Sequence, residues 1–395
     1  MMNYILISLL IIVNPVILVG QDTLSTSYIK IEKAYIEQRF QDCINFSTEE
    51  IMQSPEQADV YLLRAACFYE LDRTNKALKD IEQCLNINSN HKNCLTLSAY
   101  LKLSRINRYN KKLHQEIEYL LSIDSLNSDA HFLMASSFAV AEKYDKSIYH
   151  CLESIRLNSF SFGISEDDAY SLLPHAYYEL EDYENAIEYA TYLLDKNNSS
   201  TVLHKDLLLE RRAESYTQIK EYELSIRDWE KYMKLNNVTN EELDVAVYRK
   251  AFNYFKLQEY EKALTYLDTL IKSEISNRKK EIYTHHLRGR IRTKMGDYDG
   301  ALADFKKSRR IFYNPPLFFY FYSEFFYEKG DYKKAIKHIN KALRRHKGWS
   351  HAYYLRGKIK YKQKEFNLGC KDIKKAYDLG VEIESKYKEE CNCCR

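Results

Sequence analysis

The chain has 395 residues, and only 10 of them are Gly and 5 are Pro, well below the usage of an average domain. With 45% hydrophobic and 29% charged residues, it is expected to be an all-α, soluble protein that can bury a substantial core. The formal net charge of +3 is too small to point to any particular class of partner.

Residues 1–20 are apolar and uncharged, and the chain becomes polar at Gln21. Their length and the small Gly20 before the polar residues predict a secretory signal peptide cleaved near Gly20. Since no Lys or Arg precedes the apolar run, an uncleaved N-terminal anchor is the alternative, and it would be the only membrane attachment expected. We therefore expect an exported protein, located in the periplasm or cell envelope or secreted.

The tripeptide Gly-Asp-Tyr occurs at 296–298 and again at 330–332. Three residues after each tyrosine stands an alanine, Ala301 or Ala335, and the two alanines are 34 residues apart. A period of 34 with a glycine at the turn predicts a helix–turn–helix unit. The tyrosine is expected to wedge between the helices, and the alanine to lie where they cross too closely for a larger side chain.

Both sides of this crossing recur along the chain. In the second helix of each unit the position is small in nine of ten cases, Leu113 being the exception. It falls at Cys43, Ala77, Leu113, Ser147, Ala186, Ser225, Ala263, Ala301, Ala335 and Gly369. In the first helix the close-packing position falls at Ile31, Ala65, Ala99, Ala135, Pro174, Ala213, Ala251, Gly289, Ser323 and Gly357.

On these registers the chain is identified as a member of the tetratricopeptide repeat (TPR) family. The resemblance implies a solenoid of about ten units over residues 21–380, stacked as a right-handed superhelix. The units are expected to begin near residues 24, 58, 92, 128, 167, 206, 244, 282, 316 and 350. Spacings of 38 or 39 residues between the middle units predict longer connections. Residues 381–395 are expected to form a capping helix and a cysteine-rich tail.

In the TPR family the first helices line a concave groove that holds peptides or partner helices. Mapping the groove positions onto this register gives a largely aromatic set, and tyrosine suits recognition because it combines a large apolar face with a hydrogen-bonding tip. The alternative is that many of these rings pack between units. The candidate partner-binding residues are Tyr248, Phe252, Tyr283, His286, Arg290, Tyr320, Tyr327, Tyr354, Lys358 and Tyr361.

Charge is distributed unevenly along the chain. Residues 279–395 carry a net charge of +15, and residues 1–278 carry −12. This asymmetry supports a second hypothesis, in which the basic C-terminal units bind an anionic polymer or a membrane surface. The alternative is a solvated helical surface with no partner for its charge.

The nine cysteines fall into two groups. Cys43, Cys67, Cys84, Cys94 and Cys151 lie at or near helix-packing positions and are interpreted as small buried residues. Exported bacterial TPR proteins often end with a cysteine pair, and the resemblance implies a bond from Cys370 to Cys391 or a neighbour that would staple the terminal helix. The disulfide candidates are Cys370, Cys391, Cys393 and Cys394.

The sequence contains no motif that predicts catalysis. It has no G-x-S-x-G, no H-E-x-x-H, no phosphate-binding loop and no dinucleotide fingerprint. A thiolate metal site at the tail cysteines is the alternative and is not predicted, because a C-x-C-C sequence lacks a fourth ligand. We therefore expect a non-enzymatic scaffold that binds a protein or peptide, with no cofactor, no metal and no nucleic-acid partner.

Overall fold

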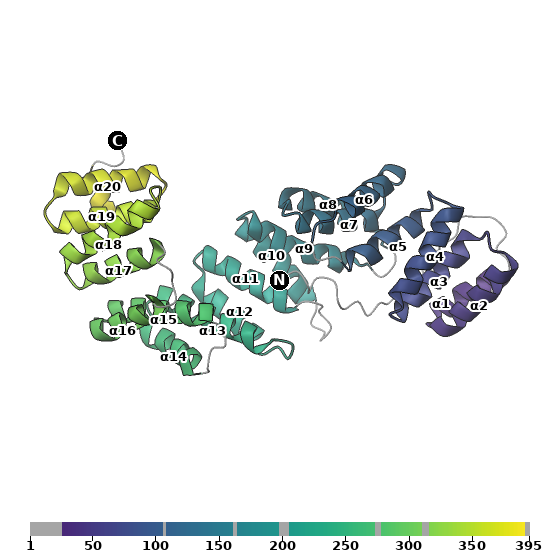
Figure 1. Cartoon of the computed structure of the whole chain (residues 1–395), viewed down its shortest axis with the longest axis horizontal. Helices are drawn as coiled ribbons and strands as arrows, with labels where there is room; N and C mark the ends of the chain where they lie inside the picture. Colours follow the sequence, from purple (N-terminus) through teal and green to yellow (C-terminus); the bar gives the residue numbers. More distant parts are fainter. Residues whose placement is uncertain are drawn as a thin grey trace. The chain divides into compact units, whose positions relative to one another are not determined.

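The computed structural model describes residues 26–105, 108–160, 164–196, 205–272, 278–309 and 316–391. All regular structure in these ranges is α-helical, in 21 helices (Figure 1). The chain divides into two compact units, unit 1 (Met1–Glu221) and unit 2 (Tyr222–Arg395). The predicted signal peptide and two of the candidate cysteines, Cys393 and Cys394, lie outside the described residues.

Unit 1 is a row of helical hairpins. Each helix packs against the next, and the odd-numbered helices also contact one another in turn from α1 to α11, so that they form a layer of their own. The helices are α1 Thr26–Ile36, α2 Phe40–Gln53, α3 Ala58–Glu70, α4 Thr74–Ile87, α5 Lys92–Leu103, α6 Lys111–Ile123, α7 Ser128–Val140, α8 Tyr144–Leu157, α9 Glu166–Glu179, α10 Tyr183–Lys196 and α11 Lys205–Gln218.

Unit 2 has the same construction. Here the layer of first helices is α13, α15, α17 and α19, each in contact with the next. The helices are α12 Tyr222–Tyr232, α13 Asn240–Lys256, α14 Tyr260–Lys272, α15 Arg278–Lys294, α16 Tyr298–Arg309, α17 Pro316–Glu328, α18 Tyr332–Arg345, α19 Ser350–Lys362, α20 Phe366–Asp378 and α21 Ser385–Glu390. No helix within the described ranges is both long and apolar enough to cross a membrane.

The two helices of a hairpin cross at the small residues that the sequence pattern identifies. The crossing of α19 and α20 shows why they must be small: a Cβ atom added to Gly357 would lie 2.6 Å from Cγ1 of Ile373 and 2.8 Å from the carbonyl oxygen of Gly369. Where a serine occupies the position it donates across the crossing, as Ser323 Oγ does to the carbonyl of Ala335 at 2.8 Å. The backbones therefore approach closely enough for direct contact.

The turn between the helices of a hairpin also repeats. The second residue before the second helix has a positive φ in nine hairpins. Only two of these residues are glycines, Gly296 and Gly330, both with φ of 81°. The others are Gln38, Asp72, Glu142, Glu181, Lys220, Gln258 and Lys364, with φ between 56° and 69°. The backbone of each of these residues adopts a left-handed conformation that costs about 1–2 kcal/mol. The packing of the hairpin must offset this cost.

Part of the longer repeat spacing in the middle of the chain comes from longer first helices. α13 and α15 are 17 residues long, whereas α17 and α19 have 13. Thr239 starts α13 early because its side chain and that of Glu242 form a capping box. The prediction of longer connections is therefore only part of the explanation. Pro174 lies buried inside α9, which continues through it from Glu166 to Glu179.

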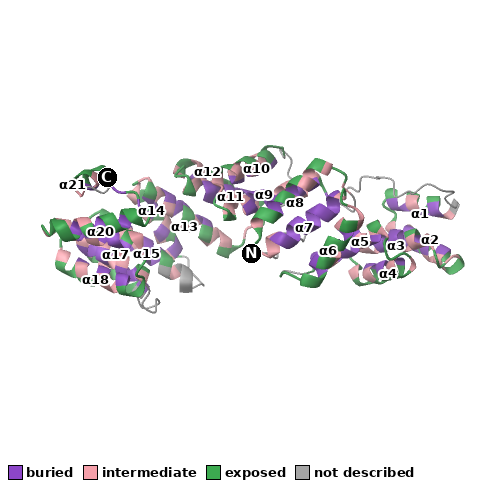
Figure 2. Ribbon diagram, turned by 90° about the horizontal axis from the view of Figure 1, so that it is seen from above, coloured by how far each residue is buried: buried purple, intermediate pink, exposed green. Residues whose placement is uncertain are grey.

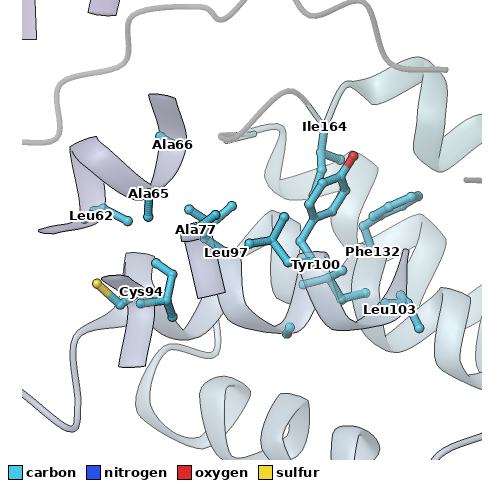
Figure 3. Close-up of a cluster of buried hydrophobic side chains, with 14 of the residues drawn as sticks. Leu62, Ala65, Ala66, Ala77, Cys94, Leu97, Tyr100, Leu103, Phe132 and Ile164 are labelled. Carbon is cyan, nitrogen blue, oxygen red and sulfur yellow. The ribbon is translucent and has the colours of Figure 1, made fainter. Parts of the chain in front are cut away.

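In unit 1 one continuous cluster of buried hydrophobic side chains runs from α1 to α9. Side chains from α3, α4, α5 and α7 meet in the part drawn in Figure 3, where Tyr100 and Phe132 lie beside Ile164 of the loop before α9. α7 is buried from Ser128 to Phe138, so that almost its whole surface is covered (Figure 2). The first helices thus supply most of the core.

Arginine–aspartate pairs join the helices of three hairpins. Arg64 donates to both carboxylate oxygens of Asp80 at 2.7 Å, and Arg356 makes the same two-bond contact with Asp372 at 2.8 and 2.7 Å. A bidentate contact of this kind is strong and geometrically specific. Each arginine also bonds the second helix of the preceding hairpin, Arg64 through Thr48 and Arg356 through Asn340. One side chain therefore ties three helices together.

The third pair, Arg288 with Asp304, lies in the most highly charged crossing. Asp304 is 1% exposed and also accepts hydrogen bonds from His285 and Arg292, both at 2.8 Å. Burial alone would raise the pKa of Asp304, but hydrogen bonds from His285 and Arg288 and the charges of Arg288 and Arg292 hold it below its usual value. The ionised carboxylate is therefore the form that the fold requires.

We predict that Asp304→Asn lowers the free energy of unfolding by about 3–5 kcal/mol, because it leaves buried cations without their counter-charge. The folded-state pKa of Asp304 is depressed. The higher unfolding free energy of the unsubstituted protein, relative to the Asn variant, is therefore present above about pH 4 and is lost as the pH falls through the folded-state pKa. Urea unfolding at several pH values measures it. The control is Asp299→Asn, which changes an exposed acid on the same helix and should shift stability by less than about 1 kcal/mol. Equal effects of the two changes would contradict the assignment.

Candidate partner-binding surface

The candidate partner-binding residues lie on the four first helices of unit 2, α13, α15, α17 and α19. The repeat register gives Tyr248, His286, Tyr320 and Tyr354 equivalent positions on these helices, at spacings of 38, 34 and 34 residues. Adjacent first helices contact each other, so these positions lie close to the neighbouring unit. The structure separates most of the candidates into three groups.

The first group lines a pocket of about 320 Å³ next to α13 and α15. Tyr248 and Tyr283 form part of its wall together with Val245, Leu270 and Thr284. Asp244 and Arg249 also line it, so charged groups of both signs lie at an otherwise apolar site. Burial raises the pKa of the Tyr248 hydroxyl, which therefore stays protonated and can donate a hydrogen bond at neutral pH. This volume is at the lower end of the range for small-ligand pockets, about 300–1,000 Å³.

The second group is held inside the fold. Arg290 lies over the ring of Phe321, with its guanidinium carbon 4.1 Å from the ring centroid, and 5.0 Å from that of Phe255. Its Nε is 3.7 Å from a carboxylate oxygen of Glu324 on α17. These contacts connect α13, α15 and α17, so Arg290 acts as an internal connection between first helices more than as a cation presented to a partner.

His286 is also buried, with 8% of its surface exposed. It meets Phe321 and Phe305 edge to face, with centroid distances of 4.5 and 5.7 Å, and neither ring nitrogen has a hydrogen-bond partner within the described part of the chain. Burial, and secondarily the charge of Arg290, lowers the pKa of His286 to about 3. The imidazole is therefore neutral and is not presented to a partner.

Phe252 on α13 and Tyr320 on α17 are partly buried and belong to none of the three groups. Lys256 lies 5.3 Å from the centroid of the Phe252 ring. The ring of Tyr320 lies against Trp349, at 4.9 Å with an interplanar angle of 30°, and against Phe321 at 5.1 Å. Tyr320 thus supports the start of α19 while part of its ring remains exposed.

The third group is covered by the end of the chain itself. Tyr387 on the short helix α21 is 4% exposed and meets Tyr361 and Tyr354 edge to face, at centroid distances of 5.3 and 6.2 Å. The segment before α21 adds polar contacts: Glu384 pairs with Lys358 at 3.0 Å, and its backbone N–H donates to the Tyr354 hydroxyl at 3.2 Å. The last unit therefore binds its own C-terminal segment where the sequence analysis expected a partner.

Tyr327, the remaining candidate, lies at the edge of this covered area. Its ring is 5.9 Å from that of Tyr332, and the ammonium group of Lys358 is 5.8 Å from its centroid. Four of the ten candidates, Tyr327, Tyr354, Lys358 and Tyr361, thus surround α21 or contact it. Tyr248 and Tyr283 line the pocket of about 320 Å³ beside α13 and α15.

The structure bonds Cys370 on α20 to Cys391 at the end of α21, with a Cα–Cα distance of 5.0 Å. It forms two further disulfides, Cys43–Cys67 and Cys84–Cys94, among residues that the sequence analysis interpreted only as packing. All four of these cysteines are fully buried, so that part of the interpretation is compatible with the bonds. What it missed is that each pair joins the second helix of one hairpin to the first helix of the next.

Many cations of the basic C-terminal segment already have internal partners. Arg288 and Arg292 contact Asp304, Arg356 and Lys360 contact Asp372, Lys294 contacts Glu328, and Lys358 contacts Glu384. The formal net charge of this segment therefore overstates the number of cations available to an external polyanion.

Comparison with protein families finds tetratricopeptide repeats at three places in the chain. Tetratricopeptide repeat models match residues 58–91, 245–274 and 286–365. The chain is therefore a tetratricopeptide repeat protein, a class that generally builds non-catalytic scaffolds for protein–protein interaction. No curated protein matches the chain in sequence.

Comparison with solved structures finds matches at low sequence identity, and the first of them shares the fold. A tetratricopeptide repeat protein from Parabacteroides merdae is 19% identical, with a TM-score of 0.57, and the match covers 67% of this chain and 98% of that one. The C-terminal part of a TPR protein from Cytophaga hutchinsonii is also 19% identical, over 55% of this chain and 81% of that one, with a TM-score of 0.37. The pilF protein of Pseudomonas aeruginosa is 18% identical, over 59% and 97%, with a TM-score of 0.43.

We predict that His286→Phe raises stability increasingly at acidic pH. The folded-state pKa of His286 is about 3, so between pH 6.5 and 3 the unfolded chain takes up a proton that the folded chain excludes. Removing the imidazole removes this cost, which grows by about 1.4 kcal/mol per pH unit over that interval. Parallel urea titrations of the two proteins at pH 7 and pH 5 provide the measurement. A difference between the two proteins that does not change with pH would show that folding does not depress the pKa of His286.

We predict that Tyr387→Ala speeds amide hydrogen exchange in α19, α20 and α21, because losing a buried aromatic ring costs about 3–5 kcal/mol of local packing. Exchange in α13 should stay unchanged. Glu389→Ala, which alters an exposed residue on the same short helix, is the matched control and should leave the pattern as it is. Unaltered protection of α19 in the Tyr387 variant would mean that the C-terminal segment does not cover the last unit.

Proposed function

We propose that this chain is a non-catalytic scaffold that binds a peptide segment of another protein on the first helices of unit 2. The observation that carries the proposal is the pocket lined by Tyr248 and Tyr283, because it is apolar with a few polar groups, as recognition sites are. An apolar side chain of the partner would enter the pocket, while Asp244 and Arg249 would fix the direction of its backbone or a neighbouring charge.

Tyrosine is suited to this role for a physical reason. Its ring supplies a large contact area with few rotatable bonds, so little conformational entropy is lost on binding. Tyr283 is 46% exposed and can bury additional surface against a ligand. Binding of this kind depends on apolar contact and should tolerate salt.

The alternative function, binding of an anionic polymer or membrane surface by residues 279–395, has weaker support. Several cations in that segment form ion pairs with buried aspartates, as Arg356 does with Asp372. Breaking such a pair to contact an external anion would leave a buried charge uncompensated. Strong salt dependence would nevertheless identify this mode if it occurs.

Under the same proposal the protein works outside the cytoplasm, in the periplasm or cell envelope. Six of its cysteines are paired as disulfides, and structural disulfides persist in oxidising compartments. The apolar residues 1–20 agree with such a location.

The test is a selection of binding peptides from an unbiased displayed library, followed by affinity measurements at 0.15 M and about 1 M salt. We expect apolar or aromatic peptides whose affinity changes little with salt. Changing both Tyr248 and Tyr283 to Ala should weaken binding by about 30-fold or more, since aromatic hot spots contribute about 2 kcal/mol or more.

The matched control is Tyr149→Ala, which removes a tyrosine that is 60% exposed on α8 of unit 1. It should leave peptide affinity unchanged, and circular dichroism must show that all variants keep their helicity and melting temperature. Selection of acidic peptides alone, bound only at low salt and equally well by the double variant, would overturn the proposal in favour of anion binding by the basic segment.

A further inference from the structure

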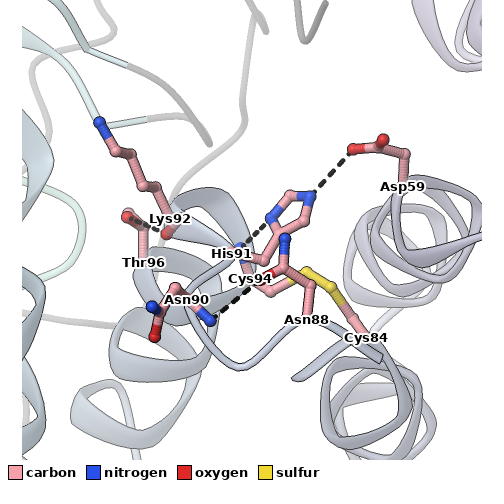
Figure 4. Close-up of a disulfide and its surroundings, with 8 residues drawn as sticks. All are labelled: Asp59, Cys84, Asn88, Asn90, His91, Lys92, Cys94 and Thr96. Carbon is pink, nitrogen blue, oxygen red and sulfur yellow. Dashed lines mark hydrogen bonds and ion pairs between the residues drawn. A yellow bond between two sulfur atoms is a disulfide. The ribbon is translucent and has the colours of Figure 1, made fainter. Parts of the chain in front are cut away.

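A group of potential metal ligands surrounds one of the disulfides. Cys84 lies in the last turn of α4, Cys94 in the first turn of α5, and His91 in the turn between them (Figure 4). One ligand atom from each of the three residues lies within 4.8 Å of the others. Among the described residues no other set of His, Cys, Asp or Glu side chains meets this criterion.

The orientation of His91 is fixed from outside the group. Its Nε2 is 3.0 Å from a carboxylate oxygen of Asp59 on α3. A carboxylate only accepts hydrogen bonds, so Nε2 carries the proton and Nδ1 of the neutral imidazole keeps its lone pair. A carboxylate that holds the second nitrogen of an imidazole in this way is the usual neighbour of a metal-binding histidine.

His91 also has an ordinary structural role, as the residue before α5. Its Nδ1 accepts a hydrogen bond from the backbone N–H of Cys94 at 3.3 Å. That role alone does not require an imidazole, because Asn110 and Asn127 cap α6 and α7 with a side-chain oxygen. Nor does it require Asp59. An imidazole anchored at Nε2 beside two cysteine sulfurs, whose unprotonated Nδ1 can exchange the Cys94 N–H for a metal ion, is better explained by a ligand site.

We propose that Cys84, His91 and Cys94 form a redox-controlled site for a thiophilic divalent cation, with Zn²⁺ as the expected ion. In the oxidised protein the two sulfurs are bonded to each other and cannot bind metal. A dithiol reductant transfers two electrons and two protons to the disulfide, leaving two thiols and the oxidised reductant. Zn²⁺ then displaces both thiol protons and is held by two thiolates and by Nδ1 of His91, with water as the fourth ligand.

The geometry permits both states. The Cα atoms of Cys84 and Cys94 are 6.5 Å apart. At Zn–S distances of about 2.3 Å, a tetrahedral ion holds two sulfurs roughly 3.8 Å apart, a separation that side-chain rotation on fixed helices can reach. Thiolate and imidazole ligands favour zinc over harder cations. In either state α4 and α5, and hence two successive hairpins, remain cross-linked, and the redox potential of the compartment sets which link is present.

The test uses the full chain, reduced with a non-chelating phosphine and titrated with zinc alone in the presence of a chromophoric chelator. We expect the reduced protein to bind one more Zn²⁺ than the Cys84→Ser/Cys94→Ser variant, which reports zinc held by the other cysteines. The oxidised protein should not bind this additional ion. Co²⁺ in place of Zn²⁺ should give the intense absorption of tetrahedral cobalt–thiolate coordination.

The decisive variant is His91→Asn. Asparagine retains an oxygen that can cap α5, so helicity and melting of the reduced, metal-free protein should be preserved, whereas zinc affinity should fall at least 10-fold. Asp59→Asn should lower zinc affinity by about 10- to 100-fold, as expected for a residue that orients a ligand. Cys43→Ser/Cys67→Ser, which removes the neighbouring disulfide, should leave the additional zinc in place.

Two results would overturn the proposal. One is equal zinc binding by the reduced native protein and by the Cys84→Ser/Cys94→Ser variant. The other is undiminished zinc affinity in His91→Asn, which would show that His91 serves only as the cap of α5.

Discussion

Each hairpin depends on a close approach of two helix backbones at one pair of small residues. Side-chain volume at that pair sets the distance between the helices, because a Cβ atom on Gly357 would already collide with α20. Successive hairpins then pack through their first helices, which contact one another in each unit. The pocket beside Tyr248, the ring contacts of Arg290 and the contacts of α21 all lie on these first helices.

The sequence predicted this constraint well because it is local and periodic. Small residues recur at the crossing whatever surrounds them, and Ala301 and Ala335 mark it without any knowledge of the neighbouring units. The arginine–aspartate pairs were within reach of the same method, since Arg64 with Asp80, Arg288 with Asp304 and Arg356 with Asp372 share a separation of 16 residues. They fall outside the small and aromatic positions that define the repeat register.

The candidate site was less predictable, for a physical reason. The register fixes the direction of a side chain on its own helix, but what covers it comes from other helices. His286 and Tyr320 occupy equivalent positions, yet Phe305 and Phe321 bury His286 while part of the Tyr320 ring stays exposed. Tyr361 is covered by Tyr387 of α21, a helix outside the repeat pattern. The pairs Cys43–Cys67 and Cys84–Cys94 were missed for the same reason, since each spans two units.

The positions of the three disulfides have a consequence for how the chain comes apart. In a linear array the terminal hairpins have a neighbour on one side only and are ordinarily the first to fray. Here Cys43–Cys67 and Cys84–Cys94 cross-link the first three hairpins, and Cys370–Cys391 cross-links the last hairpin to α21. With both termini fastened, thermal or mechanical opening is expected to begin between α6 and α18, where Cys151 is the one described cysteine and is unbonded. A protease would then find its first cleavage sites in the middle of the sequence.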